Sequence, residues 1–308
     1  MQDSLAASAT SPAAPADLAK TGLLIALAVV GALYIVTLVR AVLKARATGD
    51  VAPTPIGLAI GFVTNFFDTL GIGSYATTTA AWRALKIVPD EKIPGTLNVG
   101  HTIGTIAQTF IFTKIVPVES TTLLLMIVAA MAGSWMGAGV VSGMSRRKIQ
   151  LGMGVALLGA AILLFTSLVG ITPAGGEALG VTGVKLAMAL GGNFVLGALM
   201  TLGIGLYAPC MILVSLLGMN VQAAFPIMMG SCAFLMPVAS GRFIRTGGFD
   251  MKAALGLAIG AVPAVLIAAF IVKSLPLTVL RWVVLVVILY TAATMLRAGM
   301  QRSSATAA

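Results

Sequence analysis

The chain has 308 residues, of which 59% are apolar and 9% are charged, and its mean hydropathy is +1.06. About a quarter of the residues of a water-soluble domain are charged, so this composition excludes a soluble globular protein and indicates a protein that sits in lipid. Lysine and arginine outnumber the acidic residues 19 to 9, but they are dispersed between apolar segments. The excess therefore indicates membrane topology and contact with anionic lipids, not nucleic-acid binding.

The first elements are a polar tail and a hydrophobic helix. Residues 1–19 are rich in alanine and proline, and we expect them to be a disordered tail. Residues 20–46 are expected to form an N-terminal transmembrane helix, which is retained rather than cleaved as a signal peptide. Eight more apolar segments follow, before a C-terminal tail at residues 298–308. They cover approximately residues 55–82, 94–113, 120–141, 149–171, 183–217, 222–241, 252–272 and 278–296.

Two of these segments do not have the length or composition of a single membrane crossing. Most of the others have the roughly 18 to 25 residues that a helix needs to cross about 30 Å of hydrocarbon. The segment 55–82 is interrupted by Asn65, Asp68 and two glycines, and the segment 183–217 is too long for one crossing. We therefore expect each of them to be a broken helix.

The two broken segments contain nearly the same sequence. TLGIGSYA at residues 69–76 recurs as TLGIGLYA at 201–208, with seven identities in eight positions at a displacement of 132 residues. Other matches at the same displacement extend along both parts of the chain. The sequence therefore predicts a duplication, with repeat 1 at residues 55–171 and repeat 2 at residues 183–297.

The distribution of lysine and arginine indicates whether the repeats are parallel or inverted, because cytoplasmic loops are enriched in these residues. If each broken segment is a re-entrant hairpin of two half-helices, 14 basic residues lie on the cytoplasmic side and five on the other. The cytoplasmic set is Arg40, Lys44, Arg46, Arg83, Lys86, Lys92, Arg146, Arg147, Lys148, Arg242, Arg245, Lys252, Arg297 and Arg302.

Each repeat then consists of one hairpin and three crossings. Three is odd, so repeat 2 starts on the opposite side of the membrane from repeat 1. The predicted fold is an all-α polytopic membrane protein with an inverted-topology repeat, a periplasmic N-terminus and a cytoplasmic C-terminus.

Inverted repeats with broken helices are typical of secondary transporters, which bind substrate near the middle of the membrane where the repeats meet. Glycine lets the backbone approach a ligand closely, and a half-helix that restarts after a break presents free N–H groups and the positive end of its dipole. Such a terminus binds an anion without a charged side chain. The predicted substrate-binding residues are Thr69, Gly71, Gly73, Ser74, Tyr75, Thr77, Thr201, Gly203, Gly205, Tyr207 and Cys210.

Each of these residues also has a structural interpretation. Single glycines and threonines in membrane helices more often serve helix packing, although the duplicated unit as a whole favours a substrate site. Cys210 and Cys232 fit helix packing, with a contact to a sulfur-containing anion as the alternative. Their spacing predicts neither a metal site nor a disulfide, and no cofactor is expected.

The two repeats differ in their intramembrane ionisable groups, because Met200 and Ala233 stand at the positions that match Asp68 and His101. Asp68 precedes the first break, and His101 lies within the segment 94–113 with Asn98 one turn earlier. Ionisable residues inside a membrane are by default functional, so Asp68, Asn98 and His101 are candidates for proton coupling. The alternative is that Asp68 and His101 are a hydrogen-bonded pair that fixes the hairpin against the next helix.

Several motifs resemble those of the TauE/SafE family of membrane permeases, which is associated with export of sulfite and organosulfonates. They are Gly71-Ile72-Gly73, Gly203-Ile204-Gly205-Leu206-Tyr207-Ala208-Pro209, Gly248-Phe249-Asp250 and Leu275-Pro276-Leu277-Thr278-Val279-Leu280-Arg281. The third glycine of the family pattern is replaced by Ser74 in one repeat and by Leu206 in the other. The resemblance implies an anion permease of this superfamily.

The sequence therefore predicts a secondary-active transporter in a bacterial inner membrane, which exports a small anion such as sulfite, a sulfonate or a related organic anion. With no P-loop motif, its energy would come from an ion gradient, with a proton as the candidate coupling ion. Membrane lipids and further copies of the chain are its expected partners. Two alternatives remain, an intramembrane enzyme that uses Asp68 and His101 as acid and base, and a passive anion channel.

Overall fold

The computed structural model describes residues 15–47, 49, 51–141, 143–171, 175–203, 205–271 and 277–300. Within these ranges the chain forms eleven α-helices and two short 3-10 helices, and no strand. The elements are α1 (Pro15–Arg46), α2 (Pro55–Thr69), α3 (Tyr75–Leu85), η1 (Asp90–Lys92), α4 (Ile93–Ile115), α5 (Ser120–Val141), α6 (Arg146–Leu168), α7 (Gly183–Met200), α8 (Tyr207–Leu216), η2 (Val221–Ala223), α9 (Ala224–Thr246), α10 (Met251–Ile271) and α11 (Leu277–Met300).

The two terminal helices extend beyond their expected ends. α1 begins at Pro15, inside the expected tail, because a proline at the first helical position loses no hydrogen bond and already has a helical φ. α11 continues to Met300, into the tail expected at residues 298–308. The rest of both tails, 1–14 and 301–308, and the pair Leu275-Pro276 lie outside the described residues.

Six of the described helices are long and apolar enough to cross a membrane, which gives the chain the make-up of a multi-pass membrane protein. They cover Leu18–Arg46, Ser120–Val141, Arg147–Leu168, Gly183–Met200, Val221–Thr246 and Met251–Phe270. α4 has the length of a crossing but carries many polar residues, and these are buried inside the bundle.

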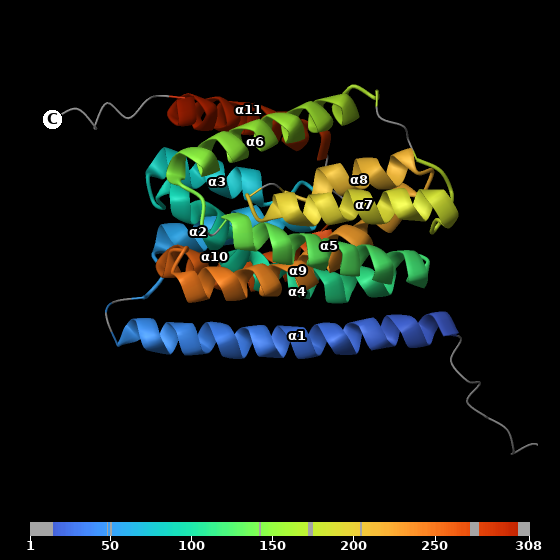
Figure 1. The fold of residues 1–308 in the computed structure, drawn as a ribbon, viewed down its shortest axis with the longest axis horizontal. Coiled ribbons are helices and arrows are strands. Elements are labelled where there is room, and N and C mark those ends of the chain that lie inside the picture. The colour runs from blue at the N-terminus through green and yellow to red at the C-terminus, as the bar shows by residue number, and fades with distance from the viewer. Residues whose placement is uncertain are drawn as a thin grey trace, which may run out of the picture.

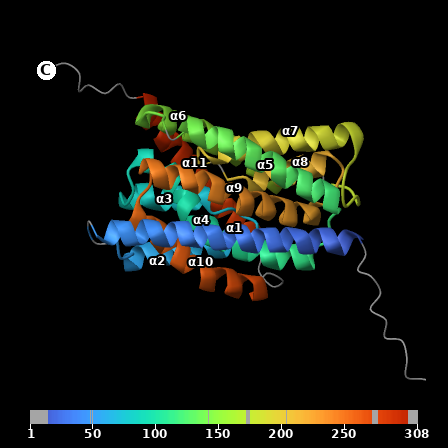
Figure 2. The ribbon, with the colours of Figure 1, turned by 60° about the horizontal axis from the view of Figure 1, so that its bottom comes forward.

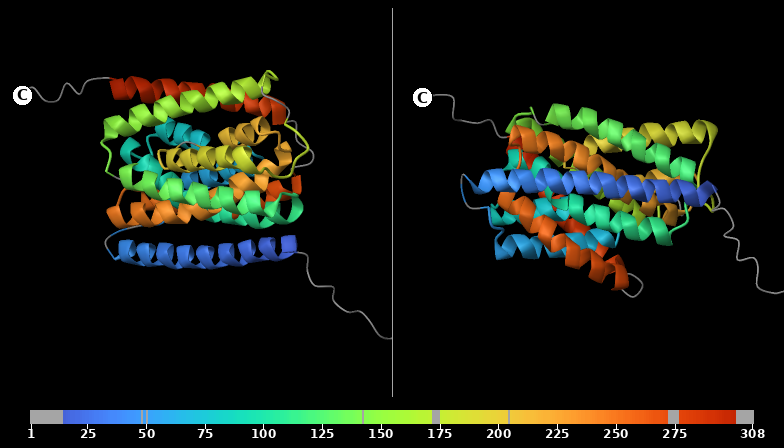
Figure 3. Two further views of the ribbon diagram at one scale, coloured as in Figure 1. Left: turned by 45° about the vertical axis from the view of Figure 1, so that its right-hand side comes forward. Right: turned by 90° about the horizontal axis from the view of Figure 1, so that it is seen from below.

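The helices run in roughly one direction and form layers (Figure 1). α1 lies along one face and packs against α9, α4 and α5. The α6–α11 pair covers the opposite face, as the left view of Figure 3 also shows. Turning the molecule brings α1 in front of the bundle (Figure 2). The broken helices therefore lie between two outer layers.

Helix contacts between the two parts of the chain occur in matched sets. α2 packs against α10 and α7 against α5; α4 packs against α10 and α9 against α5; α3 packs against α11 and α8 against α6. α4 also packs against α9, and α6 against α11. Helices about 132 residues apart correspond to each other; α3 and α8, for example, begin at Tyr75 and Tyr207. If every helix in a contact is replaced by its corresponding helix, the result is the other contact of the same set.

Several polar side chains of α4 donate hydrogen bonds to backbone carbonyls of the same helix. The threonine hydroxyls of Thr102, Thr105 and Thr109 each donate to the carbonyl four residues earlier, over 2.6 to 3.1 Å. The Tyr34 hydroxyl of α1 donates to the Val99 carbonyl over 2.5 Å. A polar helix therefore lies inside an apolar bundle without exposing these groups to lipid, where unpaired polar groups are costly.

Small residues allow the closest approach between helices. A Cβ atom on Gly61 of α2 would overlap with the Gly256 carbonyl oxygen of α10, and one on Gly197 of α7 would overlap with the Ala130 carbonyl oxygen of α5. Such spacing is typical of membrane helices, whose association depends on close packing rather than on the hydrophobic effect.

We predict that Gly197→Ala lowers the stability of the purified protein by about 1 to 3 kcal/mol, because the added methyl group forces α5 and α7 apart. The matched control is Gly191→Ala on the same helix, where a Cβ atom meets nothing within 4 Å. Thermal unfolding in one detergent would compare the two variants. Equal melting temperatures would contradict the packing seen here.

The amino end of α5 is capped by a carboxylate. Glu119 accepts hydrogen bonds from the Thr121 and Thr122 amides over 2.8 and 2.6 Å. Desolvation raises the pKa of Glu119, but the hydrogen bonds from Thr122 and Thr121 outweigh it and lower the pKa to about 2. The cap therefore stabilises the helix most when the carboxyl is ionised.

A depressed pKa means that the stabilisation is present above the ordinary pKa and is lost as the pH falls through the folded-state value. We therefore predict that Glu119→Gln lowers the melting temperature at pH 7, and that the difference from the parent protein shrinks steadily between about pH 5 and pH 2. Glu177→Gln, in the connection between α6 and α7, removes the same charge without uncapping a helix. If the difference in melting temperature between Glu119→Gln and the parent does not change with pH, Glu119 is not a charge-dependent cap of α5.

Candidate functional site

The first broken helix stops at Thr69 and restarts at Tyr75. Gly71 and Gly73 have φ values of +82° and +88°, which only glycine adopts without strain. The first internal hydrogen bond of α3 runs from the Thr78 amide to the Ser74 carbonyl, so the preceding amides have no partner within the helix. Ser74 occupies the N-cap position and makes no capping hydrogen bond with its side chain.

The second broken helix repeats this arrangement. α7 stops at Met200, Gly203 has a φ of +91°, and α8 restarts at Tyr207. Its N-cap is Leu206, whose side chain has no acceptor for the first amides. In both short helices the N-cap residue therefore makes no capping hydrogen bond with its own side chain, and at the amino end of α3 the Asp68 carboxyl interacts with the Ser74 amide and hydroxyl.

The two breaks meet in the middle of the bundle. A Cβ atom on Gly205 would lie 4.0 Å from the Cβ atom of Tyr75. Between the breaks lies a small cavity with room for about one water molecule. Its walls contain Asp68, Gly73, Ser74, Tyr75, Thr105, Met200, Gly205, Leu206, Tyr207 and Cys232. Residues from both breaks thus surround one space.

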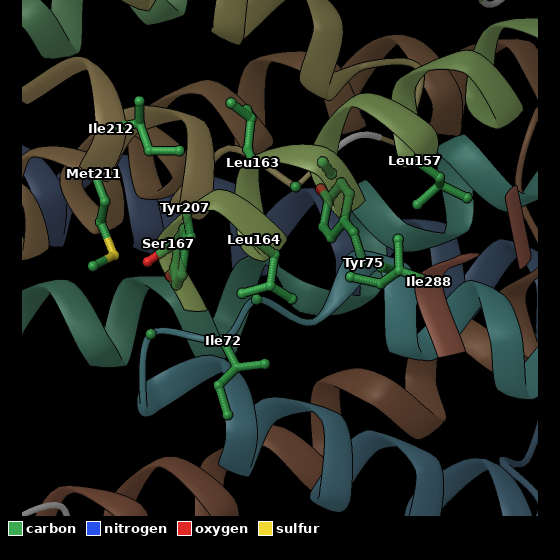
Figure 4. Close-up of a pocket in the computed structure, with 15 residues that line it drawn as sticks. Ile72, Tyr75, Leu157, Leu163, Leu164, Ser167, Tyr207, Met211, Ile212 and Ile288 are labelled. Atoms are coloured by element: carbon green, nitrogen blue, oxygen red, sulfur yellow. The ribbon is translucent and has the colours of Figure 1, made fainter. Parts of the chain in front are cut away.

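A larger cavity adjoins the first and shares four wall residues with it. Figure 4 draws its lining, in which Leu163 and Leu164 of α6 appear between Tyr75 and Tyr207. The lining consists of Gly71, Ile72, Gly73, Tyr75, Ala76, Leu157, Ala160, Leu163, Leu164, Ser167, Gly205, Tyr207, Met211, Ile212 and Ile288. Ser167 is exposed, so the cavity reaches the surface near the carboxyl end of α6.

A hydrogen-bond chain joins the two breaks through α4. The Gln108 amide nitrogen donates to a carboxyl oxygen of Asp68 over 2.9 Å and to the Thr69 hydroxyl over 3.0 Å. The Gln108 oxygen accepts from the Tyr207 hydroxyl over 2.6 Å. All four side chains are buried. Gln108 therefore connects the carboxyl of the first break to the tyrosine of the second.

His101 connects the two halves of the first broken helix. Its Nδ1 lies 3.0 Å from the Asn65 side-chain oxygen of α2, and its Nε2 lies 3.0 Å from the Thr78 hydroxyl of α3. Both ring nitrogens thus have partners when the ring is neutral, with Nδ1–H donating to Asn65 and Thr78 donating to Nε2. His101 therefore ties α2 and α3 to α4, and its partners are Asn65 and Thr78 rather than the expected Asp68.

One polar atom at the site has no partner. The Tyr75 hydroxyl is buried and forms no hydrogen bond, and the side chain is 2% exposed. Tyr75 lines both cavities and packs its ring against His101 at 5.7 Å between centroids. An unpaired buried hydroxyl costs stability, and this one is covered by protein atoms in the state described here.

The structure brings together six of the eleven predicted binding residues. Gly71, Gly73, Ser74, Tyr75, Gly205 and Tyr207 line one or both of the cavities. The others are placed behind the walls described here. Thr69 bonds to Gln108, Thr77 to the Ser74 carbonyl and Thr201 to the Ala198 carbonyl. Gly203 packs against Met153, and Cys210 is buried in the apolar core.

Of the three residues predicted to couple a proton, one lines a cavity and two do not. Asp68 lines the small cavity, whereas His101 and Asn98 are outside the described walls of both cavities. The Asn98 amide nitrogen donates to the Pro94 carbonyl over 2.9 Å. Cys232, which the sequence assigned to packing, does line the small cavity, with its thiol 3.4 Å from the Met200 sulfur.

No protein-family model, curated protein or solved structure matches this chain. The resemblance to the TauE/SafE family therefore stays a prediction.

The site residues predicted from the sequence did not include Gln108 or the residues of α6 that complete the larger cavity. Gln108 could have been predicted from the sequence. The polar residues of this segment are spaced by three or four positions and so share one face of a helix; they are Asn98, His101, Thr105 and Gln108. Nothing in the sequence distinguishes the cavity-lining leucines of α6 from its other apolar residues; they are Leu157, Leu163 and Leu164.

The two glycines of the second break are predicted to respond differently to alanine. Gly203→Ala should destabilise the protein by about 1 to 2 kcal/mol, because a left-handed φ is unfavourable for a residue with a Cβ atom, and that atom would also lie 2.8 Å from the Met153 methyl group. Gly205→Ala has neither problem, and its free energy of unfolding should lie within about 0.5 kcal/mol of the parent's. Equal destabilisation, measured by thermal unfolding, would contradict this backbone geometry.

Proposed function

We propose that this protein is a secondary transporter of a small organic or sulfur-containing anion, with one substrate site where the two breaks meet. The observation that carries the proposal is that the first residues of the two short helices, Tyr75 of α3 and Tyr207 of α8, line the same cavities. Two positive helix termini directed at one space favour a negative charge. This attraction needs no buried lysine or arginine, which would be costly in a membrane.

The proposal includes inverted repeats with two re-entrant hairpins. α2 and α3 have 15 and 11 residues, so they span only about 22 and 16 Å, too little to cross about 30 Å of hydrocarbon separately. In Figure 1 α2 and α3 lie in one half of the bundle and α7 and α8 in the other, and within each pair the chain turns back near the middle. The matched helix contacts support a two-fold relation between the repeats.

Access to the site is proposed to alternate between the two ends of the bundle. At the lysine- and arginine-rich end, Arg83 forms an ion pair with Asp90 at 2.8 Å, and Gln150 donates to Asp90 over 2.7 Å. Arg83 also donates to the Thr294 carbonyl of α11 over 3.5 Å. We infer that these contacts close that end, which we assign to the cytoplasm, whereas the larger cavity opens near Ser167. On this assignment, the state described here is proposed to face the periplasm.

Asp68 is the proposed coupling residue. Its carboxyl lines the small cavity beside both helix termini, so an ionised Asp68 and a bound anion repel each other at short range. A proton on Asp68 removes that repulsion. Anion and proton would therefore bind together and cross together, in whichever direction the gradients drive them.

Two other functions are less well supported by the geometry. An intramembrane enzyme with Asp68 and His101 as acid and base needs both groups at one reacting centre, but they bond to different partners. A passive channel needs a path open at both ends, and the Arg83 contacts close one end. The location in a bacterial inner membrane, the TauE/SafE relationship, export as the natural direction and self-association are parts of the proposal on the sequence grounds given above.

Transport of methanesulfonate into proteoliposomes would test the coupling, because this strong acid stays ionised and carries no proton itself. With one proton per anion, each pH unit, acidic outside, should drive about tenfold accumulation. Asp68→Asn should still equilibrate the anion but should not accumulate it.

His101→Gln is the matched control, since it removes the other titratable group while leaving a hydrogen-bonding side chain between Asn65 and Thr78. It should keep the accumulation. If His101→Gln abolishes accumulation and Asp68→Asn keeps it, the coupling assignment is wrong. If the parent protein moves no anion above the rate of empty vesicles, the transporter proposal itself fails.

A further inference from the structure

The α6–α11 pair is joined to the rest of the bundle mainly through the two short helices. Six other helices pack in one continuous series, α2 with α10, α10 with α4, α4 with α9, α9 with α5 and α5 with α7. Outside the pair itself, the main contacts of α11 are with α3, and those of α6 are with α8 and η1. Figure 1 shows the pair as a layer beyond α3 and α8. The described helices thus include a core, the six in series, and a cover, the α6–α11 pair.

The two helices of the cover pack closely against each other. A Cβ atom on Gly154 of α6 would lie 2.7 Å from the Leu296 side chain of α11. One on Gly299 of α11 would lie 2.7 Å from the Leu151 side chain of α6. The Arg147 guanidinium of α6 also donates to the Gly299 carbonyl over 3.0 Å. Because close packing resists sliding and separation, we expect the cover to move as one body.

The packing between the cover and the short helices is looser. The larger cavity lies there, and its walls come from the leucines of α6 and from the first residues of α3 and α8 (Figure 4); they are Leu157, Leu163, Leu164, Tyr75 and Tyr207. Protein interiors otherwise contain few voids larger than a water molecule. The cavity therefore leaves room for the cover to tilt against the short helices.

A polar network ties the cover to α3 and η1. Arg83, in the last turn of α3, forms an ion pair with Asp90 of η1 at 2.8 Å, and these side chains are only 19% and 11% exposed. Gln150 of α6 donates to the Asp90 carboxylate over 2.7 Å. On α11, the Arg83 guanidinium lies 2.8 Å from the Met295 sulfur and donates to the Thr294 carbonyl over 3.5 Å. The ion pair therefore holds both helices of the cover.

The matching positions of the second repeat carry no charge. Ser215 and Gln222 stand 132 residues after Arg83 and Asp90. The Ser215 hydroxyl donates to the Met211 carbonyl of its own helix over 2.8 Å. These two residues cannot form an ion pair between α8 and η2. The attachment of the cover is therefore asymmetric between α3 and α8, although the helix contacts of the repeats are matched.

We propose that the cover is the part that moves to open the site alternately at its two ends, and that the Arg83–Asp90 ion pair is a latch that holds it against α3. This rests on the proposed function, because a transporter must open one site to both sides. With a latch at one end alone, the resting protein favours the state that is closed there. Breaking the latch lets the cover tilt away from α3 and toward α8.

Distances between pairs of nitroxide labels, measured by pulsed electron paramagnetic resonance on the protein in nanodiscs, test this motion. Cys210→Ala and Cys232→Ala remove the native thiols. The first label pair reports on the latch, with Ala84→Cys on α3 and Arg297→Cys on α11, both at exposed positions.

Two further label pairs report on the rest of the bundle. Val169→Cys, just after α6, and Leu216→Cys on α8 follow the other end of the cover, and both positions are exposed. Val140→Cys on α5 and Arg245→Cys on α9 lie on exposed positions of two core helices that pack against each other. The core pair should keep one distance in every variant.

Asp90→Asn and Arg83→Gln each remove one charge of the latch and leave the other without its partner. In both variants a second, longer distance should appear in the first label pair, and its population relative to the short distance should rise by about tenfold or more. The second label pair should move closer together in the same variants. The double variant should shift the populations no further than the larger single change, because either substitution already removes the coupling between the two charges.

Asp250→Asn is the matched control. It removes a carboxylate that lies at the same end of the bundle, since the Asp250 amide donates to the Thr96 hydroxyl of α4 over 2.9 Å. The Asp250 carboxylate accepts from the Ala253 amide over 2.9 Å and so caps a core helix, α10, instead of holding the cover. This variant should show the distances of the parent in all three label pairs.

The outcomes separate the latch from the function on which it rests. If no latch variant produces the longer distance while the parent accumulates methanesulfonate, the latch is wrong and the transporter proposal stands. A core pair that separates as well, or an equal effect of Asp250→Asn, would mean that the bundle loosens as a whole, which also overturns the latch. If the first label pair separates while the second stays unchanged, both ends are open together, and the proposed function falls with the moving cover.

Discussion

The structure depends on how it accommodates two interrupted helices inside an apolar bundle. Each interruption leaves backbone amides without partners within the helix, and in hydrocarbon such groups must be paired or buried in protein. The fold meets this constraint by placing both breaks against each other, with α4 and α9 on one side and the α6–α11 pair on the other. The central cavity between the breaks follows from this arrangement, and so do the two half-helix termini that face it.

The two breaks share a left-handed glycine, Gly71 in the first and Gly203 in the second, but they differ in chemistry. The first is tied to α4 through His101 and Gln108, and it carries the only carboxyl in the described cavity walls. At the position matching Asp68, the second has Met200, which also lines the small cavity. Gln108 links the two through Tyr207. The carboxyl therefore lies on one side of the cavity, and a methionine takes the matching place on the other.

Much of the fold could be predicted from the sequence, because its signals are local. Chain composition indicated a membrane, and the repeated TLGIG sequence located both interruptions, which the structure places at residues 70–74 and 201–206. The site was predicted less completely. Glycines that line a cavity and those that pack, such as Gly205 and Gly203, look alike in sequence. The apolar wall from α6 depends on contacts between distant segments, for which single apolar residues carry no signal.

The central claim is that both half-helix termini act on one bound anion. Anomalous diffraction from crystals soaked in iodide, a weakly hydrated monoanion, would locate that anion directly. A single strong peak should lie between the amide groups of Tyr75 and Tyr207, and competition with methanesulfonate should remove it. Iodide peaks confined to surface lysines and arginines, with none between the two breaks, would contradict the claim.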